Sequence, residues 1–378
     1  MPNFILRDDA LIHLQLCPLT LTRSIADCRI GITTIKEKWE SHLAISKIGI
    51  STMDYLHDLY EPLHISDDTL FIASHYLPNE QLIKEILQLK PNESLVFGEQ
   101  IIASYQLAAH KIETKANLIC VKHPWDLFSQ NAVVLEEDFT WITKGRTSQC
   151  LDIHSKIIGD PNRLFIEEGA IVNASIFNTT TGSIYIGKEA EVMENTVIRG
   201  GFALCEHAGT KLSTKVYGAT TIGPYCKIGG EVNNSILFGY SNKGHDGFLG
   251  NSVIGEWCNL GADTNNSNLK NNYSEVKSYS YAAKGEVKTG LQFCGLMMGD
   301  HSKSSINTMF NTGTVCGVSA NIFHSGFPPK FIRSFSWGDQ RFDFEKALEV
   351  ARRMMERRGK VLTKEAISVL QHLYTQSV

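Results

Sequence analysis

A six-residue periodicity beginning at Ile186 constrains the fold of this chain more than any other feature. Aliphatic or near-aliphatic residues recur every six positions in one register: Ile186, Val192, Ile198, Leu204, Thr210, Val216, Ile222 and Ile228. The residues four places after these are small or apolar, from Ala190 to Val232. A short fixed period is typical of solenoids, whose repeats bury a core only by stacking on one another. Three hexads would complete one coil of roughly 18 residues, so we predict a left-handed parallel β-helix with three flat faces.

The register shifts by two residues after Ile228, and we expect a bulge or protruding loop over residues 231–235 to absorb the shift. The later positions of the repeat are Ile236, Asn242, Phe248, Ile254 and Leu260, then Ile306, Thr312 and Val318, while Ile166 and Val172 precede the main run. A β-sandwich of alternating strands would show a period of two, which this region lacks.

The nine cysteines form no C-x-x-C pair, so the sequence indicates neither a zinc site nor a disulfide framework. Cys226, Cys258 and Cys316 occupy the small inward position of the repeat, where we expect compact apolar side chains. A β-helix can also host a zinc lyase with three histidine ligands. That site needs two closely spaced histidines, whereas His207, His245, His301 and His324 lie far apart in the sequence.

Three regions follow from these patterns. Residues 1–145 alternate short apolar runs with helical segments, expected at 25–44 and 79–89, which predicts a small α/β domain. Residues 150–327 form the predicted β-helix. Residues 328–378 form a tail in which we expect two helices, at 342–358 and 363–374, packed on the end of the prism, with Thr363 as an N-cap.

Composition indicates which classes of partner and which cellular compartment to expect. The formal net charge of −4 across 378 residues gives no basic excess, so we expect no nucleic-acid partner. No apolar run approaches the roughly 20 residues that span a bilayer, so we expect no membrane association. The first residues carry acids where a secretion signal needs cations, which predicts a cytoplasmic protein.

Residues 229–273 carry a family resemblance. This segment contains GGEVNNSILFGYSNKGHDGFLGNSVIGEWCNLGADTNNSNLKNNY, and it is similar without gaps from about Glu231 to Asn268 to the acetyltransferase half of the bifunctional glucosamine-1-phosphate acetyltransferase and N-acetylglucosamine-1-phosphate uridyltransferase family. Looser similarity covers the whole predicted β-helix. The resemblance implies a homotrimer, active sites in grooves between neighbouring prisms, and acetyl-CoA or another acyl-CoA as co-substrate.

The resemblance also implies individual roles. His245 falls on the family's general base, and the backbone N–H of Ala262 on the donor that stabilises the oxyanion. Asn259 and Asn268 match positions that hold the sugar phosphate, and Lys215 falls near an arginine that grips the phosphate. The chain departs from the pattern where Asn233 and Phe248 replace a lysine and a tyrosine, and where Leu269 replaces another tyrosine. These substitutions predict a changed acceptor.

The N-terminal region occupies the place of the family's nucleotidyltransferase domain. Residues 18–23, PLTLTR, resemble the stretch that follows its phosphate-binding loop, but the loop itself is missing because the first glycine is Gly31. The strand expected to end in a metal-binding aspartate reads Phe71-Ile72-Ala73-Ser74-His75, so we expect no bound metal, and Mg²⁺ only if this domain is active. Arg23 and Arg29 are the candidates for holding a sugar nucleotide.

Together these features predict an acyl-CoA-dependent transferase acting on a small sugar phosphate or nucleotide sugar, with an N-terminal domain that binds a nucleotide without turning it over. Two alternatives stay open at this point. One is an active sugar-1-phosphate nucleotidyltransferase, and the other is a non-catalytic sensor or scaffold that binds sugar nucleotides.

Overall fold

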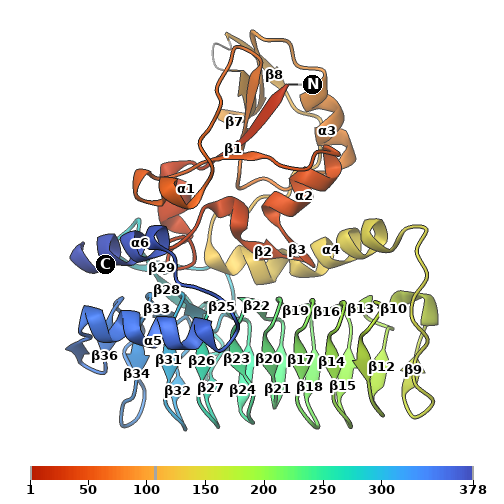
Figure 1. Cartoon of the computed structure of the whole chain (residues 1–378), viewed down its shortest axis with the longest axis vertical. Coiled ribbons are helices and arrows are strands. Elements are labelled where there is room, and N and C mark those ends of the chain that lie inside the picture. Colours follow the sequence, from red (N-terminus) through yellow and green to blue (C-terminus); the bar gives the residue numbers. More distant parts are fainter. Residues whose placement is uncertain (1, 106–108, 377–378) are drawn as a thin grey trace.

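The computed structural model describes residues 2–105 and 109–376. It contains an α/β domain, a parallel left-handed β-helix and a tail of two helices, which confirms the predicted fold class (Figure 1). Both the α/β domain and the tail fold back onto the β-helix. Among the described residues, no helix combines the length and apolarity that a bilayer crossing requires.

The α/β domain is built on one six-stranded sheet in the order β4-β1-β5-β7-β6-β8. Its first three strands are parallel, whereas β7 runs antiparallel to both of its neighbours. Its elements are β1 (Asn3–Arg7), α1 (Ala10–Gln15), α2 (Ile35–His42), β4 (Gly49–Ser51), β5 (Thr69–Ala73), α3 (Glu80–Leu87), β6 (Glu93–Phe97), β7 (Gln100–Tyr105) and β8 (His110–Glu113).

The helix expected over residues 25–44 is present only in its second half. Thr34 and Glu37 form a capping box that starts α2 at Ile35. The preceding residues form a 3-10 turn (Ile25–Asp27) and a small hairpin of β2 (Arg29–Ile30) and β3 (Thr33–Thr34), with Gly31 at a positive φ of 67° in the turn. The helix predicted at 79–89 is confirmed as α3, and Asn79 caps it.

Each face of the prism is a ladder of short strands, all parallel except β37 at the end of face 2. Face 1 contains β10 (Leu164–Ile166), β13 (Ile184–Ile186), β16 (Phe202–Leu204), β19 (Thr220–Ile222), β22 (Ile236–Gly239), β25 (Val253–Glu256), β30 (Met297–Met298), β33 (Val315–Cys316) and β35 (Phe331–Ile332). Face 2 contains β11 (Ile171–Val172), β14 (Glu191–Val192), β17 (Gly209–Thr210), β20 (Lys227–Ile228), β23 (Asn242–Lys243), β26 (Asn259–Leu260), β31 (Lys303–Ser304), β34 (Asn321–Ile322), β36 (Ser336–Trp337) and β37 (Gln340–Arg341). Face 3 contains β9 (Lys156–Ile158), β12 (Ile176–Asn178), β15 (Val197–Arg199), β18 (Lys215–Tyr217), β21 (Glu231–Asn233) and β24 (Phe248–Gly250), followed by the pair β27 (Asn265–Asn266) and β32 (Met309–Phe310).

The repeat positions fill the prism as the periodicity predicts. The aliphatic residues from Ile186 to Ile228 are buried in one apolar cluster, which also contains Cys226, Cys258 and Cys316 as free thiols. Burial raises the pKa of Cys226 and of Cys316 to about 12, so these thiols stay protonated and pack as small apolar groups.

The register shift is absorbed by a shorter coil, and the expected loop over 231–235 is wrong. Ile198 aligns with Val216, 18 residues on, but Val216 aligns with Val232, only 16 residues on. Gly230, at a φ of 71°, tightens the corner between faces 2 and 3. In the following coil the inward residues are therefore Leu237, Lys243 and Leu249 instead of the expected Ile236, Asn242 and Phe248.

The tail contains α5 (Phe344–Glu356) and α6 (Lys364–Thr375), and the Thr363 side chain caps α6 as predicted by accepting from the Ala366 N–H. The helices do not sit on the end of the prism. The tail crosses the flank, where Arg358 just beyond α5 contacts Asn242 of face 2, and α6 packs on the 3-10 helix Asp54–Leu59 of the α/β domain (Figure 1). A hairpin of β28 (Lys277–Ser280) and β29 (Gly285–Lys288) packs against the apolar core that the α/β domain and the tail share.

Helix α4 (Pro124–Thr143) fastens the α/β domain to face 1. Its Asn131 side chain accepts from the Gly31 N–H at 2.7 Å and donates to the Ala219 carbonyl at 2.9 Å and to the Thr221 hydroxyl at 3.1 Å. Since Asn131 is fully buried, these bonds lock the hairpin of the α/β domain, α4 and face 1 together.

Candidate functional site

His245 and Ala262 lie on neighbouring coils at the same edge of the prism, where face 2 turns into face 3. We call residues 244–247 and 261–264 the histidine corner. The Asp263 N–H donates to the Asp246 carbonyl at 3.1 Å and so fixes the two turns against each other. His245 is exposed and its ring makes no hydrogen bond with any described residue. Because a three-sided prism has this edge opposite face 1, the corner points away from the α/β domain.

The backbone N–H of Ala262 is free to meet a ligand. Its carbonyl accepts from the Asn307 N–H at 2.8 Å, but among the described residues the N–H itself has no acceptor. Gly261 allows the next coil to pack closely, since a Cβ on it would lie 2.5 Å from the Ser305 backbone. The corner therefore presents an imidazole and an unpaired amide from adjacent coils.

Lys243 directly precedes the histidine corner, and its inward orientation was not predicted from the sequence. Its side chain points into the prism with 1% of its surface exposed, and its Nζ donates to the carbonyls of His245 and Asp246, the latter at 3.0 Å. Burial lowers the pKa of Lys243 to about 8, against attraction from Asp246 and Asp263. The ammonium thus holds the histidine-bearing turn from inside.

The other candidates implied by the family resemblance spread over two faces. Lys215 and Phe248 occupy one row at the start of face 3, with Glu231 between them. Asn233 and Asn268 lie at the far edge of that face, where the Asn268 amide donates to Asn251 at 2.8 Å. Asn259 stands apart because its strand, β26, belongs to face 2.

The α/β domain contains a cavity of about 550 Å³ at the carboxyl ends of β1 and β5, the edge at which open α/β sheets bind ligands. Asp8 lies at its base. Its carboxylate accepts from the hydroxyls of Ser24, Thr52 and Ser74 and from the Ile25 N–H, and Asp9 accepts from two N–H groups of α1. These acids are already satisfied by the protein.

The donors around this cavity do not fit a magnesium–triphosphate complex. No described group of three or more His, Cys, Asp and Glu side chains is arranged to hold a metal. His75 follows β5 where a metal-binding carboxylate was sought, and burial lowers its pKa to about 4, so it is neutral at pH 7. Its buried Nδ1 has no hydrogen-bond partner among the described residues.

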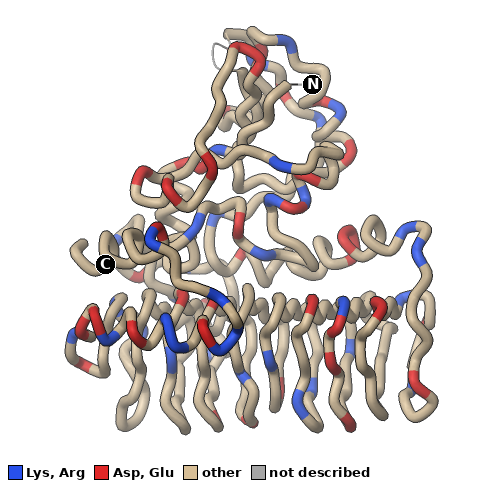
Figure 2. Tube along the Cα trace, viewed as in Figure 1, with Lys and Arg blue, Asp and Glu red and all other residues tan. Residues whose placement is uncertain are grey.

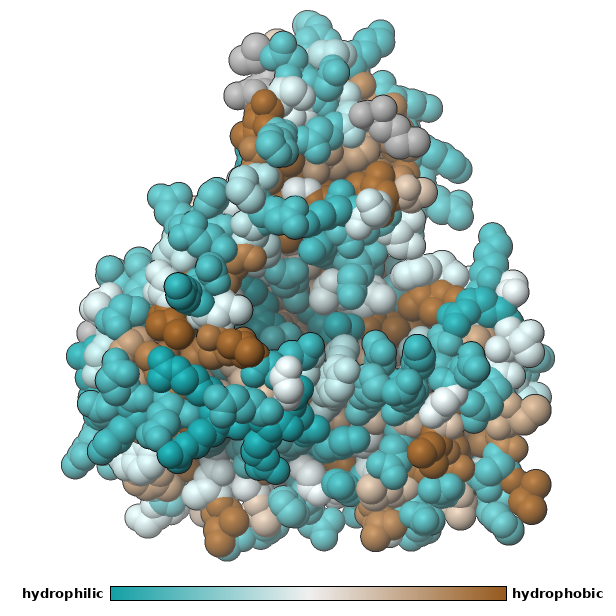
Figure 3. Space-filling model, in the orientation of Figure 1, coloured by the Kyte–Doolittle hydropathy of each residue, from teal (hydrophilic) through white to brown (hydrophobic). Residues whose placement is uncertain are grey.

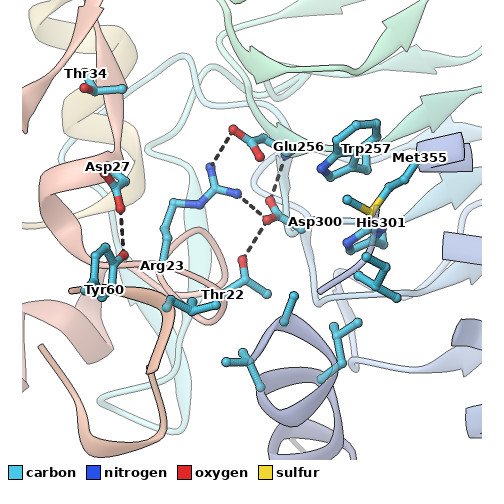
Figure 4. Close-up of a pocket in the computed structure, with 15 residues that line it drawn as sticks. Thr22, Arg23, Asp27, Thr34, Tyr60, Glu256, Trp257, Asp300, His301 and Met355 are labelled. Atoms are coloured by element: carbon cyan, nitrogen blue, oxygen red, sulfur yellow. Dashed lines mark hydrogen bonds and ion pairs between the residues drawn. The ribbon is translucent and has the colours of Figure 1, made fainter. Parts of the chain in front are cut away.

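Arg23 lines a second cavity, of about 350 Å³, between the α/β domain, the prism and the tail (Figure 4). Its guanidinium pairs with Asp300 and lies 3.7 Å from Glu256, both from the prism, while the Thr22 hydroxyl donates to Asp300 at 2.7 Å. Burial lowers the pKa of Arg23, but the two carboxylates outweigh burial and raise it. The residue predicted as a nucleotide contact is thus the centre of a buried ionic cluster.

Arg29 also contacts the prism, at the interface between the α/β domain and face 1. Its Nε donates to the Phe238 carbonyl at 3.1 Å and its Nη1 to the Ile32 carbonyl at 2.5 Å, with 8% of the residue exposed. Because the residue is buried and its Nε and Nη1 already donate to backbone carbonyls, little of this guanidinium is left for a ligand.

Comparison with known protein families agrees with the architecture of the N-terminal region. Residues 4–147 match a family model described as sugar nucleotidyl transferase. A search of curated proteins found no match. The match covers the α/β domain and α4, so the chain joins a nucleotidyltransferase-like domain to a left-handed parallel β-helix and a helical tail.

Proposed function

We propose that this protein is an acyl-CoA-dependent transferase, most simply an acetyltransferase, that acylates a sugar phosphate or nucleotide sugar at the histidine corner. The proposal rests on one observation. The exposed imidazole of His245 and the Ala262 N–H, which has no acceptor among the described residues, lie on adjacent coils at the same edge of the prism. The family match of residues 4–147 supports a sugar-nucleotide context.

The proposed reaction uses both groups. His245 accepts a proton from the amine or hydroxyl of the sugar as that atom forms a bond to the thioester carbonyl carbon. The Ala262 N–H donates to the oxygen that becomes negative, a contribution of roughly 3 kcal/mol where one such donor has been removed elsewhere. When the tetrahedral intermediate collapses, the carbon–sulfur bond breaks and the imidazolium returns the proton to the CoA thiolate. Lys243 is a positioning residue because it binds the carbonyl of His245 from within the prism.

A homotrimer is part of this proposal. The histidine corner borders face 3, whose outward side chains Ile176, Val197 and Tyr217 are 37–39% exposed. A neighbouring prism against that face would enclose the corner and exclude water from it. Sedimentation velocity tests the trimer directly, since a monomeric protein that turns over would remove it from the proposal.

The α/β domain is proposed to bind a sugar nucleotide without transferring the nucleotidyl group. The cavity at β1 and β5 supports binding, while the already satisfied Asp8 and the neutral His75 argue against two-metal catalysis. Release of pyrophosphate from a sugar phosphate and a nucleoside triphosphate with Mg²⁺ would instead favour an active nucleotidyltransferase.

A thiol-release assay with acetyl-CoA and a panel of amino- and hydroxy-sugar phosphates and nucleotide sugars tests the transferase. We expect turnover that His245→Ala lowers by about 10² to 10⁴ fold, the range for loss of a general base. His154→Ala is the matched control because His154 is also exposed but lies at the far end of the prism. Equal activity of wild type and His245→Ala would remove His245 from the mechanism. Tight ligand binding without turnover by the wild type would favour the sensor.

A further inference from the structure

A groove of about 340 Å³ separates the C-terminal end of α5 from face 2 of the prism, and the charge on its walls is of one sign. Arg353, Arg357 and Arg358 line it from the tail, and Lys303 from the prism. Among the described residues, no carboxylate lines it. Figure 2 shows Lys and Arg interspersed with Glu along α5 and its exit, and Figure 3 shows a hydrophilic surface there.

The floor of the groove is a row of hydrogen-bond donors. Asn242, Asn259 and Lys303 are in register on β23, β26 and β31, and their neighbours in the chain point into the prism, so these three side chains point outward. Adjacent strands are separated by about 4.8 Å, so the row spans about 10 Å, which is long enough to contact both phosphates of a diphosphate. Tyr240 also lines the groove.

Most of the positive charge is uncompensated. Arg353 pairs with Glu349 at 2.5 Å, but Lys303, Arg357 and Arg358 form no ion pair with any residue that the structure describes. Arg358 instead reaches across the groove to the Asn242 side-chain oxygen at 3.4 Å. These three cations line one groove, so a multiply charged anion bound between them would pair with several of them at once.

The helix dipole alone does not account for the cluster. The negative end of the α5 dipole attracts arginines in and after the last turn, which explains Arg353, Arg357 and Arg358. Lys303 belongs to another element, and its Nζ donates to the His301 carbonyl at 2.7 Å beneath the arginines. Burial lowers the pKa of Lys303 to about 8, so the fold maintains this cation at a cost.

We propose that the groove between α5 and face 2 binds the pyrophosphate group of a nucleotide diphosphate or of coenzyme A. Arg357, Arg358 and Lys303 supply the charge, and the amides of Asn242 and Asn259 orient the phosphate oxygens. Strand β26 connects this groove to the histidine corner, because Asn259 precedes Ala262 by three residues. The site does not require the acyl transfer proposed above.

Isothermal titration of the full chain with inorganic pyrophosphate tests the site. We expect saturable binding that weakens with ionic strength and is reduced about tenfold or more in the double variant Arg357→Gln/Arg358→Gln, because two charge-assisted bonds are lost. The control Lys346→Gln/Arg352→Gln removes the same charge from exposed positions of α5 outside the groove, and its affinity should stay within about twofold of wild type. Lys303→Met should weaken binding from the prism side, and thermal unfolding of each variant checks its fold.

Competition with UDP and with coenzyme A distinguishes the two sources of the pyrophosphate group. The ligand that displaces pyrophosphate at the lower concentration identifies the source, and its own affinity should fall in the arginine double variant. No saturable binding by the wild type, or equal weakening in the double variant and its control, would overturn the proposal. The same titrations on His245→Ala should match wild type, so failure of the groove and failure of the acyltransferase are separate outcomes.

Discussion

The buried ammonium of Lys243 makes a prediction in which the sign and the size both follow from the structure. The pKa of Lys243 is lowered from 10.5 to about 8 in the fold by burial. At a pH above 10.5, the pKa of this lysine in the unfolded chain, the side chain is neutral in both states and does not lower the free energy of unfolding. As the pH falls from 10.5 to 8 the unfolded chain binds the proton and the folded protein does not, so stability is lost, by about 3 kcal/mol when complete.

The perturbation is Lys243→Met, which keeps the length of the side chain but cannot titrate. Many other groups change charge at high pH, so the quantity to measure is the difference in unfolding free energy between wild type and variant. Wild type should gain about 2 kcal/mol relative to the variant between about pH 7.5 and about pH 9.5. The variant also leaves the carbonyls of His245 and Asp246 without their donor, but that loss does not depend on pH.

Urea unfolding followed by far-ultraviolet circular dichroism at several pH values gives these differences. A second variant, Lys215→Met, is the control, because it makes the same replacement at an exposed position of face 3. A difference for Lys243→Met that changes with pH no more than the control would refute the reasoning, since the ammonium of Lys243 could then not lie inside the prism.

Three further substitutions test the packing. Arg23→Ala leaves the buried carboxylate of Asp300 and the half-buried carboxylate of Glu256 without their counter-charge, so we expect a loss of about 3 kcal/mol in urea unfolding; a loss below about 1 kcal/mol would contradict the ionic cluster. Ile222→Ala opens a cavity in the prism and should cost about 2–5 kcal/mol, against about 0.5 kcal/mol or less for the exposed Leu212→Ala. Thr363→Ala removes the cap of α6 and should lower the unfolding free energy by about 1 kcal/mol, and no change would contradict the cap.

The prism was predictable because its signal is periodic and strong. From Ile186 to Ile228 the inward residues repeat without interruption, and the structure places them where the hexads require. The prediction failed after the shift because a periodic pattern cannot distinguish an inserted loop from a shortened corner. Ile236 reads as an inward residue, yet it faces the α/β domain, where an apolar residue is equally favourable.

The candidate site was likewise predicted only in part. His245 and Ala262 came from a local resemblance, and the structure brings them to one corner. The inward orientation of Lys243 was not predicted, because the hexad register assigned the inward position to Asn242 and because lysines are seldom buried. Arg23 and Arg29 were read as ligand contacts because sequence does not show which domain faces which, and both contact the prism.

The two chain ends folding back onto the β-helix restrict how copies of this protein can meet. The α/β domain and α4 lie over face 1, and α5 lies beside face 2, whereas face 3 from β9 to β18 keeps its outward side chains in solvent. If the proposed homotrimer forms, this flank is available to a second copy, and it adjoins the edge that carries His245. Self-association and chemistry would then share one side of the molecule, and the nucleotidyltransferase-like domain would project from the opposite side, accessible in every copy.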